Sequence, residues 1–184
     1  MTLGPDDAAR RLLESRGYRE VRRHFAMTIE LAAAPARPEL PEEFAFVDFQ
    51  ENDAEAWYAA MNEIFEAEWS FDLGTFDEWW QVRSADDHTL WFFIQHNGAI
   101  AGLVQAEEGR RGGGVVHWVG VRKPWRRRGL GRALLLEAFG ALYARGASRV
   151  GLGVDSENPS QATRLYENVG MRVEADHATF VRSL

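Results

Sequence analysis

A run of arginines and glycines, RRRGLG at residues 126–131, stands between a strand pattern and a helix pattern. The strand pattern is GVVHWVGV at 114–121, and the helix pattern is LGRALLLEAFGALYARG at 130–146. The first amides of a helix have no intrahelical partner, and Gly129 and Gly131 leave them uncovered. This turn therefore predicts an anion site, with a solvated basic loop as the alternative.

Phosphate or pyrophosphate is the anion that such a helix start favours. The common nucleotide motifs do not fit, because GxGxxG needs glycine where Leu134 stands and no GxxxxGK(S/T) occurs. The formal net charge of −7 argues against a nucleic-acid partner, since duplex-binding domains normally present a basic face. The basic residues of this chain are therefore a local feature.

The chain contains no cysteine, which excludes disulfides, thiol nucleophiles and CxxC zinc sites and fits a reducing compartment. No signal-peptide pattern is present, and no apolar run approaches the ~20 residues of a membrane span. We expect a cytoplasmic protein without a membrane partner or a bound metal.

The remaining pattern predicts one mixed α/β sheet with helices on both faces. Helices are expected at 5–16, 53–69, 75–84, 130–146 and 159–170, and strands at 18–31, 43–49, 89–95, 99–107, 114–121, 149–155 and 171–184. Asn97 and Gly98 predict a hairpin turn. Residues 32–43 hold three prolines and no periodicity, which is typical of a linker.

Residues 9–31 repeat residues 162–184 as helix, glycine and strand. The identical pairs are Ala9/Ala162, Arg11/Arg164, Leu12/Leu165, Glu14/Glu167, Gly17/Gly170, Arg19/Arg172, His24/His177 and Leu31/Leu184. Two amphipathic helices with glycine caps can match by chance. Alternatively, residues 1–31 are the last helix and strand of a second domain copy, followed by the linker and a main domain at 44–184. Their strand then joins the sheet of its own domain or that of a neighbouring subunit, giving an intertwined homodimer.

Two motifs resemble the GNAT superfamily of acyl-CoA N-acyltransferases. RRRGLG fits the family pattern Q/R-x-x-G-x-G/A, with Arg126, Gly129 and Gly131 in register. The segment 152–171, LGVDSENPSQATRLYENVGM, is similar to the family's strand, Asn and AxxLYExxGF helix, with Met171 in place of the usual aromatic residue. The resemblance implies a mixed, mostly antiparallel central sheet with helices on both faces.

The resemblance also implies a function. An N-acetyltransferase would move an acetyl group from acetyl-CoA, its cosubstrate, to a primary amine of a small molecule by direct attack in a ternary complex. Protein N-terminal or lysine acetylation, and a non-catalytic acyl-CoA-binding module, are the alternatives.

The family's cofactor-binding roles fall on matching positions of this sequence. Backbone groups of Val119, Gly120 and Val121 and the Asn158 side chain would contact the pantetheine, and Arg126, Arg127, Arg128, Gly129, Leu130, Gly131 and Arg132 would hold the pyrophosphate. Tyr166 would lie beside the thioester sulfur and protonate the departing thiolate. Packing of an amphipathic helix is the other interpretation of this tyrosine.

The attacking amine must lose a proton, and His117 is the candidate base because it precedes Val119 by two residues on the same strand. Some aralkylamine acetyltransferases resemble this stretch and carry a histidine there. Glu107 and Glu108 are second candidates. A hydrogen-bonded structural histidine and solvated glutamates are the alternatives.

Acceptor specificity in the family comes from the first two helices and their loop, here EIFEAEWSFDLGTFDEWW at 63–80. We expect a pocket for an amine on an apolar or extended body, with cationic amines attracted by the carboxylates. The candidate substrate-binding residues are Glu63, Phe65, Glu66 and Trp69, with Glu68 and Asp72 nearby. Aromatic residues at helical spacing also suit a core, and acidic residues a solvated face.

Overall fold

The computed structural model describes residues 7–69, 71–109, 112–156 and 162–182. The chain divides into two compact units, one made of residues 31–150 and the other of residues 1–30 and 151–184. Each unit is described by itself.

The unit of residues 31–150 contains four antiparallel strands in the order in which they occur along the chain. They are β2 (Ala45–Asp48), β3 (Trp91–His96), β4 (Ala99–Glu108) and β5 (Gly113–Val121). Asn97 and Gly98 join β3 to β4 with φ of 48° and 81°, the left-handed values that a tight two-residue hairpin requires. The predicted hairpin is therefore present.

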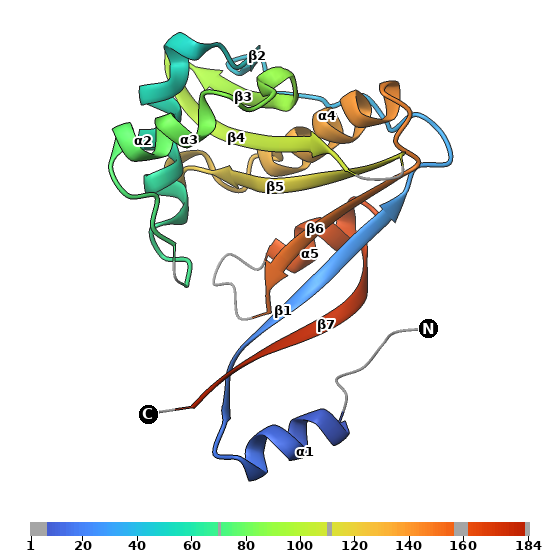
Figure 1. Ribbon diagram of the computed structural model, residues 1–184. Helices are drawn as coiled ribbons and strands as arrows, with labels where there is room; N and C mark the ends of the chain where they lie inside the picture. Colours follow the sequence, from blue (N-terminus) through green and yellow to red (C-terminus); the bar gives the residue numbers. More distant parts are fainter. Residues whose placement is uncertain (1–6, 70, 110–111, 157–161, 183–184) are drawn as a thin grey trace. The chain divides into compact units, whose positions relative to one another are not determined.

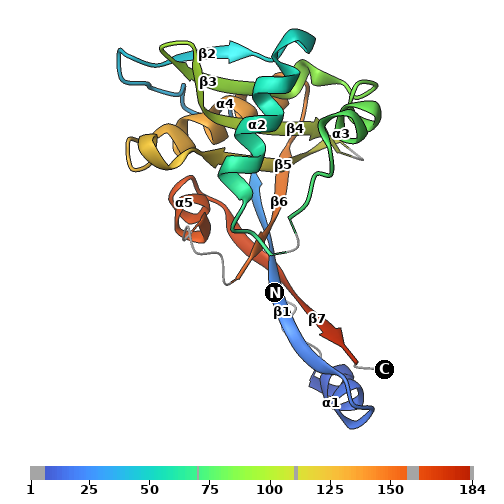
Figure 2. The same ribbon diagram turned by 90° about the vertical axis from the view of Figure 1, so that its left-hand side faces the viewer.

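Helices cover both faces of these strands. In Figure 2, α2 (Ala54–Phe65) crosses in front of β4 and β5, and α4 (Leu130–Ala144) lies behind them. The shorter α3 (Phe76–Arg83) packs beside α2 and begins with a capping box between Thr75 and Glu78. Short 3-10 turns occur at Glu51–Asp53, His88–Leu90 and Lys123–Trp125.

The core on the α2 side is aromatic. Trp57 of α2 stacks on Trp91 of β3 with ring centroids 5.2 Å apart, and Phe49 and Trp79 belong to the same buried cluster. On the other face, α4 buries an aliphatic run that includes Leu134, and this explains the long apolar pattern of its sequence.

The unit of residues 1–30 and 151–184 has strand order β6-β1-β7. Its elements are α1 (Asp7–Ser15), β1 (Arg19–Glu30), the larger part of β6 (Arg149–Asp155), α5 (Ala162–Asn168) and β7 (Arg172–Val181), and β1 and β7 form the long antiparallel ribbon of Figure 1. The N-terminal strand thus pairs with the C-terminal strand of its own chain, the first of the two alternatives for this strand.

In the β1–β7 ribbon, two residues that are equivalent in the internal repeat lie opposite each other. His24 lies opposite His177, and Arg23 and Phe25 lie opposite Ala178 and Asp176. His24 and His177 are also equivalent in the repeat, so a local two-fold relation exchanges the two strands over this stretch. That symmetry supports a second-copy origin for residues 1–31, which stays a prediction.

The predicted fold class, a mixed and mostly antiparallel α/β fold with helices on both faces, is confirmed. The clearest difference concerns the helix expected at 53–69, which ends at Phe65. Its last expected residues form turns, with the amide of Glu68 donating to the carbonyl of Phe65. No helix in the described part of the chain is long and apolar enough to cross a membrane.

One partly buried carboxyl of α4 gives a prediction for pH-dependent stability. Burial raises the pKa of Glu137, and the charge of Asp48 adds to this effect. The pKa of Glu137 is higher in the folded than in the unfolded state, so protonation of this carboxyl stabilises the folded protein. This stabilisation is fully present below the usual Glu pKa and is lost as the pH rises through the raised pKa. We expect Glu137→Gln to raise the melting temperature at pH 7 and to lose this advantage below the usual Glu pKa of 4.5.

Differential scanning calorimetry at several pH values measures this effect. Asp48→Asn should give a smaller gain of the same sign, and the double variant should gain less than the sum, because the two carboxyls act on each other. A Glu137→Gln protein that melts lower than wild type at pH 7, or that gains equally at all pH values, contradicts the assignment.

Candidate active site

The basic glycine loop ends in an exposed helix start. Gly129 is the N-cap of α4 with φ of 81°, and its carbonyl accepts from the Ala133 amide at 3.0 Å. Arg127 also has a positive φ, 65°, which is uncommon for a residue other than glycine. A Cβ added at Gly129 would meet no atom within 4 Å, so space is open beside the first amides of the helix.

Cations surround this helix start. The side chains of Arg126, Arg127, Arg128 and Arg132 are all exposed. Arg126 donates from Nε to the Val121 carbonyl at 2.9 Å, and Arg128 pairs with Glu43 at 3.1 Å. Within the described part of the chain, neither Arg127 nor Arg132 forms an ion pair. The helix dipole, the free amides and these guanidinium groups together can bind a phosphate-bearing ligand.

A β-bulge places His117 on β5. Gln105 pairs with Trp118 and the next residue of β4, Ala106, pairs with Val116, so His117 is the extra residue of β5. Its Nε2 lies 2.9 Å from Oε1 of Glu107, and its side chain is 39% exposed. Simple strand alternation does not apply across the bulge, and the structure pairs the candidate base with one of the two candidate glutamates.

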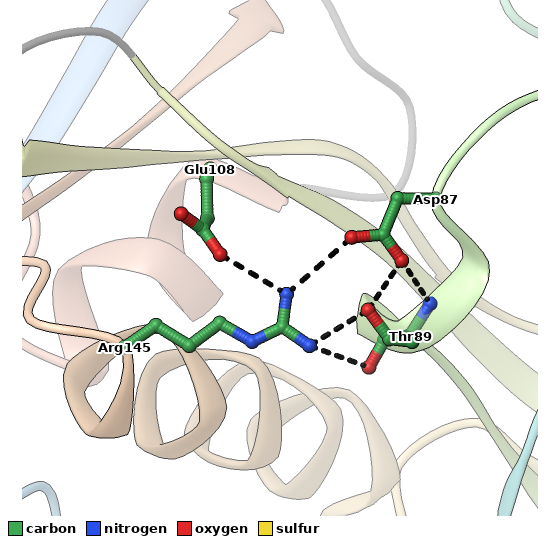
Figure 3. A network of polar contacts seen from close by, with 4 residues as sticks. All are labelled: Asp87, Thr89, Glu108 and Arg145. Atoms are coloured by element: carbon green, nitrogen blue, oxygen red, sulfur yellow. Dashed lines mark hydrogen bonds and ion pairs between the residues drawn. The ribbon is translucent and has the colours of Figure 1, made fainter.

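The two glutamates lie on opposite faces of β4. Glu107 meets His117, whereas Glu108 accepts from Arg145 at the end of α4 at 3.2 Å. Figure 3 shows that Arg145 also contacts Asp87 and donates to Thr89 Oγ1 at 2.7 Å. The environment of Glu108 is therefore that of a structural ion pair tying the strand to the helix end.

Gly120 lets α2 approach β5 closely. A Cβ built at Gly120 overlaps Cγ2 of Ile64 and lies 3.0 Å from Cζ of Phe65. The contact fixes the C-terminal turn of α2 above the strand segment that the sequence assigned to pantetheine binding. Gly120 is thus a packing requirement as well as a predicted ligand contact.

We expect Gly120→Ala to destabilise the protein by roughly 1–3 kcal/mol, the usual result of overpacking, because α2 must shift. Gly140→Ala is the matched control. It lies in α4 where a Cβ meets nothing within 4 Å, and it should stabilise by about 0.5–1 kcal/mol. Urea denaturation compares the two. Equal stability of Gly120→Ala and wild type would show that the close approach is not required.

The carboxylates at the end of α2 are paired with cations. Glu63 Oε2 accepts from Arg122 Nε at 2.8 Å, and Glu66 pairs with Lys123 at 2.6 Å. The Arg122 guanidinium holds the pKa of the Glu63 carboxyl below its usual range. These glutamates therefore add little net negative charge for attracting a cationic amine, and a direct acceptor role for them stays a prediction.

Of the two aromatic candidates, Phe65 is buried among other rings and Trp69 is exposed. Phe65 is buried, with its ring centroid 4.9 Å from that of Trp118 and 5.7 Å from that of Phe71. Trp69 is 48% exposed in the loop between α2 and α3. Phe71 and Trp118 also meet at 5.6 Å, so three rings form one surface beside β5.

The remaining candidates belong to the other unit. Tyr166 is buried on α5, and its carbonyl accepts from the Met171 amide at 3.0 Å. Asn158 lies outside the described residues. The loop, β5 and α2 candidates thus lie in one unit, whereas the roles of Tyr166 and Asn158 rest on the sequence resemblance.

The sequence was compared with models of known protein families. Residues 54–171 match the acetyltransferase (GNAT) family. The chain belongs to the GNAT acetyltransferase family. The match contains the glycine loop, the bulged strand and α5, and it confirms the resemblance found in the sequence.

Individual proteins that are similar to this GNAT protein are also acetyltransferases. It is 33% identical to a mycothiol acetyltransferase of Thermobispora bispora over 89% of this chain and 58% of the relative, and 30% identical to that of Beutenbergia cavernae over 94% and 62%. A GCN5-related N-acetyltransferase of Sphaerobacter thermophilus superposes with a TM-score of 0.85 and 36% identity, covering 97% of this chain and 57% of the other. The chain thus spans about three fifths of the length of each.

Sequence reasoning missed three features of this GNAT domain. The pairing of Arg122 with Glu63 joins residues 59 positions apart, and only the opposite charges hinted at it. The valine-rich strand pattern around His117 gives no indication of a bulge. Gln105, a polar residue within the apolar pattern AIAGLVQAE, could have been found because it interrupts that pattern on a buried strand.

Proposed function

We propose that the protein transfers an acetyl group from acetyl-CoA to the primary amine of a small molecule. The observation that carries this proposal is the exposed start of α4, where Gly129 opens the first amides and four arginines surround them in a chain of the GNAT family. A pyrophosphate bound there would be held by helix amides and guanidinium groups together.

The proposed chemistry is one displacement in a ternary complex. The amine nitrogen attacks the thioester carbonyl, the C–N bond forms, and collapse of the tetrahedral intermediate breaks the C–S bond. His117 accepts the amine proton, with Glu107 orienting and charge-stabilising its ring. Tyr166 protonates the leaving thiolate, so CoA leaves as the free thiol.

The class of acceptor follows from the relatives by analogy. The curated relatives are named mycothiol acetyltransferases, which points to a small molecule rather than a protein. Because the chain spans only part of their length, we assign the class of acceptor and not its identity. The cytoplasmic location stays a prediction of the sequence.

A thiol-release assay with acetyl-CoA and a library of primary amines tests the proposal. We expect thiol release with a subset of small amines and acetylated products in the mass spectrum. Release only with lysine-bearing peptides or protein N-termini identifies a protein acetyltransferase. Binding of acetyl-CoA without release for any acceptor contradicts the catalytic proposal and leaves a binding module.

A further inference from the structure

Gln105 of β4 is a buried polar side chain without a visible structural role. It is 8% exposed. The other polar side chain buried to this degree, among the residues that the structure describes, is Asp155, which accepts from Arg22 at 2.6 Å. Within that same part of the chain, the Gln105 carboxamide makes no hydrogen bond. Its polar atoms are not among the fully buried side-chain atoms that lack a partner in the described residues, so the carboxamide reaches the protein surface and is open to a ligand.

The surroundings of Gln105 are aromatic. Its cross-strand neighbours are Trp91 on β3 and Trp118 on β5. Directly opposed residues share a face of the sheet, so the carboxamide lies on the face covered by α2 and α3. Trp118 is one of the three rings, with Phe65 and Phe71, that form the surface beside β5.

The same face carries the candidate base. Glu107 follows Gln105 by two residues, so it lies about 7 Å further along the same side of β4. The Glu107 carboxylate contacts Nε2 of His117. His117 is the extra residue of the β5 bulge and immediately precedes Trp118. A small acceptor whose amine reaches His117 can therefore place a neighbouring group against Gln105.

The charges near Gln105 indicate which kind of neighbouring group the acceptor carries. Glu63 and Glu66, two of the four nearby carboxylates expected to attract cations, are paired with Arg122 and Lys123. A carboxamide offers one acceptor and two donors without charge. Polar recognition on this face is thus suited to neutral groups.

We propose that Gln105 is a specificity-determining residue that hydrogen-bonds a neutral hydroxyl or amide group next to the reactive amine of the acceptor. This inference rests on the proposed acetyltransferase function. It assigns the acceptor class as amines bearing adjacent hydroxyl or amide groups, and it disfavours purely hydrocarbon amines. Sites built to hydrogen-bond a substrate discriminate strongly against analogues that lack the group.

The test compares isosteric amine pairs in wild type and Gln105→Met. The pairs are 2-aminoethanol with propylamine, and glycinamide with isobutylamine. We expect wild type to prefer the polar member in kcat/KM. Gln105→Met should reduce that preference by roughly ten- to a hundred-fold, the effect of one buried hydrogen bond, with the KM for acetyl-CoA unchanged. Gln105→Leu is the second variant should methionine pack poorly.

Gln95→Leu is the matched control, since Gln95 lies on the neighbouring strand opposite Ala45 and Ile100. It should keep the wild-type preference. Absence of thiol release by wild type with every amine defeats the proposed function itself. Active wild type whose preference survives in both Gln105 variants, with or without a change in melting temperature, overturns the inference and indicates a buried structural amide.

Discussion

Gly129→Val is expected to abolish most of the acetyl-CoA affinity of this protein. The valine side chain would project into the open space beside the first amides of α4, where we propose that the pyrophosphate binds. Loss of two or more charge-assisted hydrogen bonds at about 1.5–3 kcal/mol each corresponds to at least a hundred-fold weaker binding. Isothermal titration with acetyl-CoA measures the change.

The other end of the same helix supplies the control. Gly146 follows α4 with φ of 89°, and a Cβ there also meets nothing within 4 Å. Gly146→Val should therefore lose similar stability, about 1–2 kcal/mol or somewhat more, because both valines are forced into a left-handed conformation. Its acetyl-CoA affinity should equal that of wild type. Equal affinity losses in both variants would assign the effect to backbone strain rather than to the anion site.

His117→Ala is expected to lower kcat by roughly 10²–10⁴, the range of a lost general base, with acetyl-CoA affinity retained. The variant lacks the ring nitrogen that would accept the amine proton, so the loss should appear in kcat rather than in the KM for acetyl-CoA. Glu107→Gln should give a smaller decrease, because the ring keeps its proton-accepting nitrogen and loses only a charged partner at 2.9 Å.

His177→Ala controls for removal of a strand histidine, since His177 is exposed on β7 in the other unit. It should leave kcat at the wild-type value. An unchanged rate in His117→Ala would remove this histidine from the mechanism and transfer the role to Glu107 or to water.

The glycine loop and the element order could be predicted because they depend on local sequence. Gly129 takes a left-handed conformation at the start of a 15-residue apolar helix, and both features are visible in the letters. The hairpin at Asn97 is equally local. The family assignment followed from two such local motifs at a suitable separation.

The electrostatics of the site could not be predicted, because they depend on contacts between distant segments. The sequence predicts Glu63 as an acceptor-binding carboxylate but does not predict its contact with Arg122, which lies 59 positions away. Period-two alternation assigns a face to every strand residue, and a single bulge at His117 invalidates that assignment locally. Tyr166 stays a prediction because the structure describes its helix in the other unit.

Residues 1–31 retain their proposed origin in a second domain copy. His24 and His177 are equivalent in the repeat alignment and also lie opposite each other in the strand register. This agreement supports the second-copy origin, which stays a prediction. The strand contributes to the sheet of its own chain, so an exchanged strand is not needed to satisfy its pairing.

Thermal melting in the presence of acetyl-CoA tests the central claim most directly. At a concentration a hundred times the dissociation constant, binding contributes about 2.7 kcal/mol and should raise the melting temperature by roughly 5–10 °C. Inorganic pyrophosphate should give a smaller shift and duplex DNA none. A melting temperature unchanged by acetyl-CoA, or raised equally by DNA, contradicts an acyl-CoA site at the start of α4.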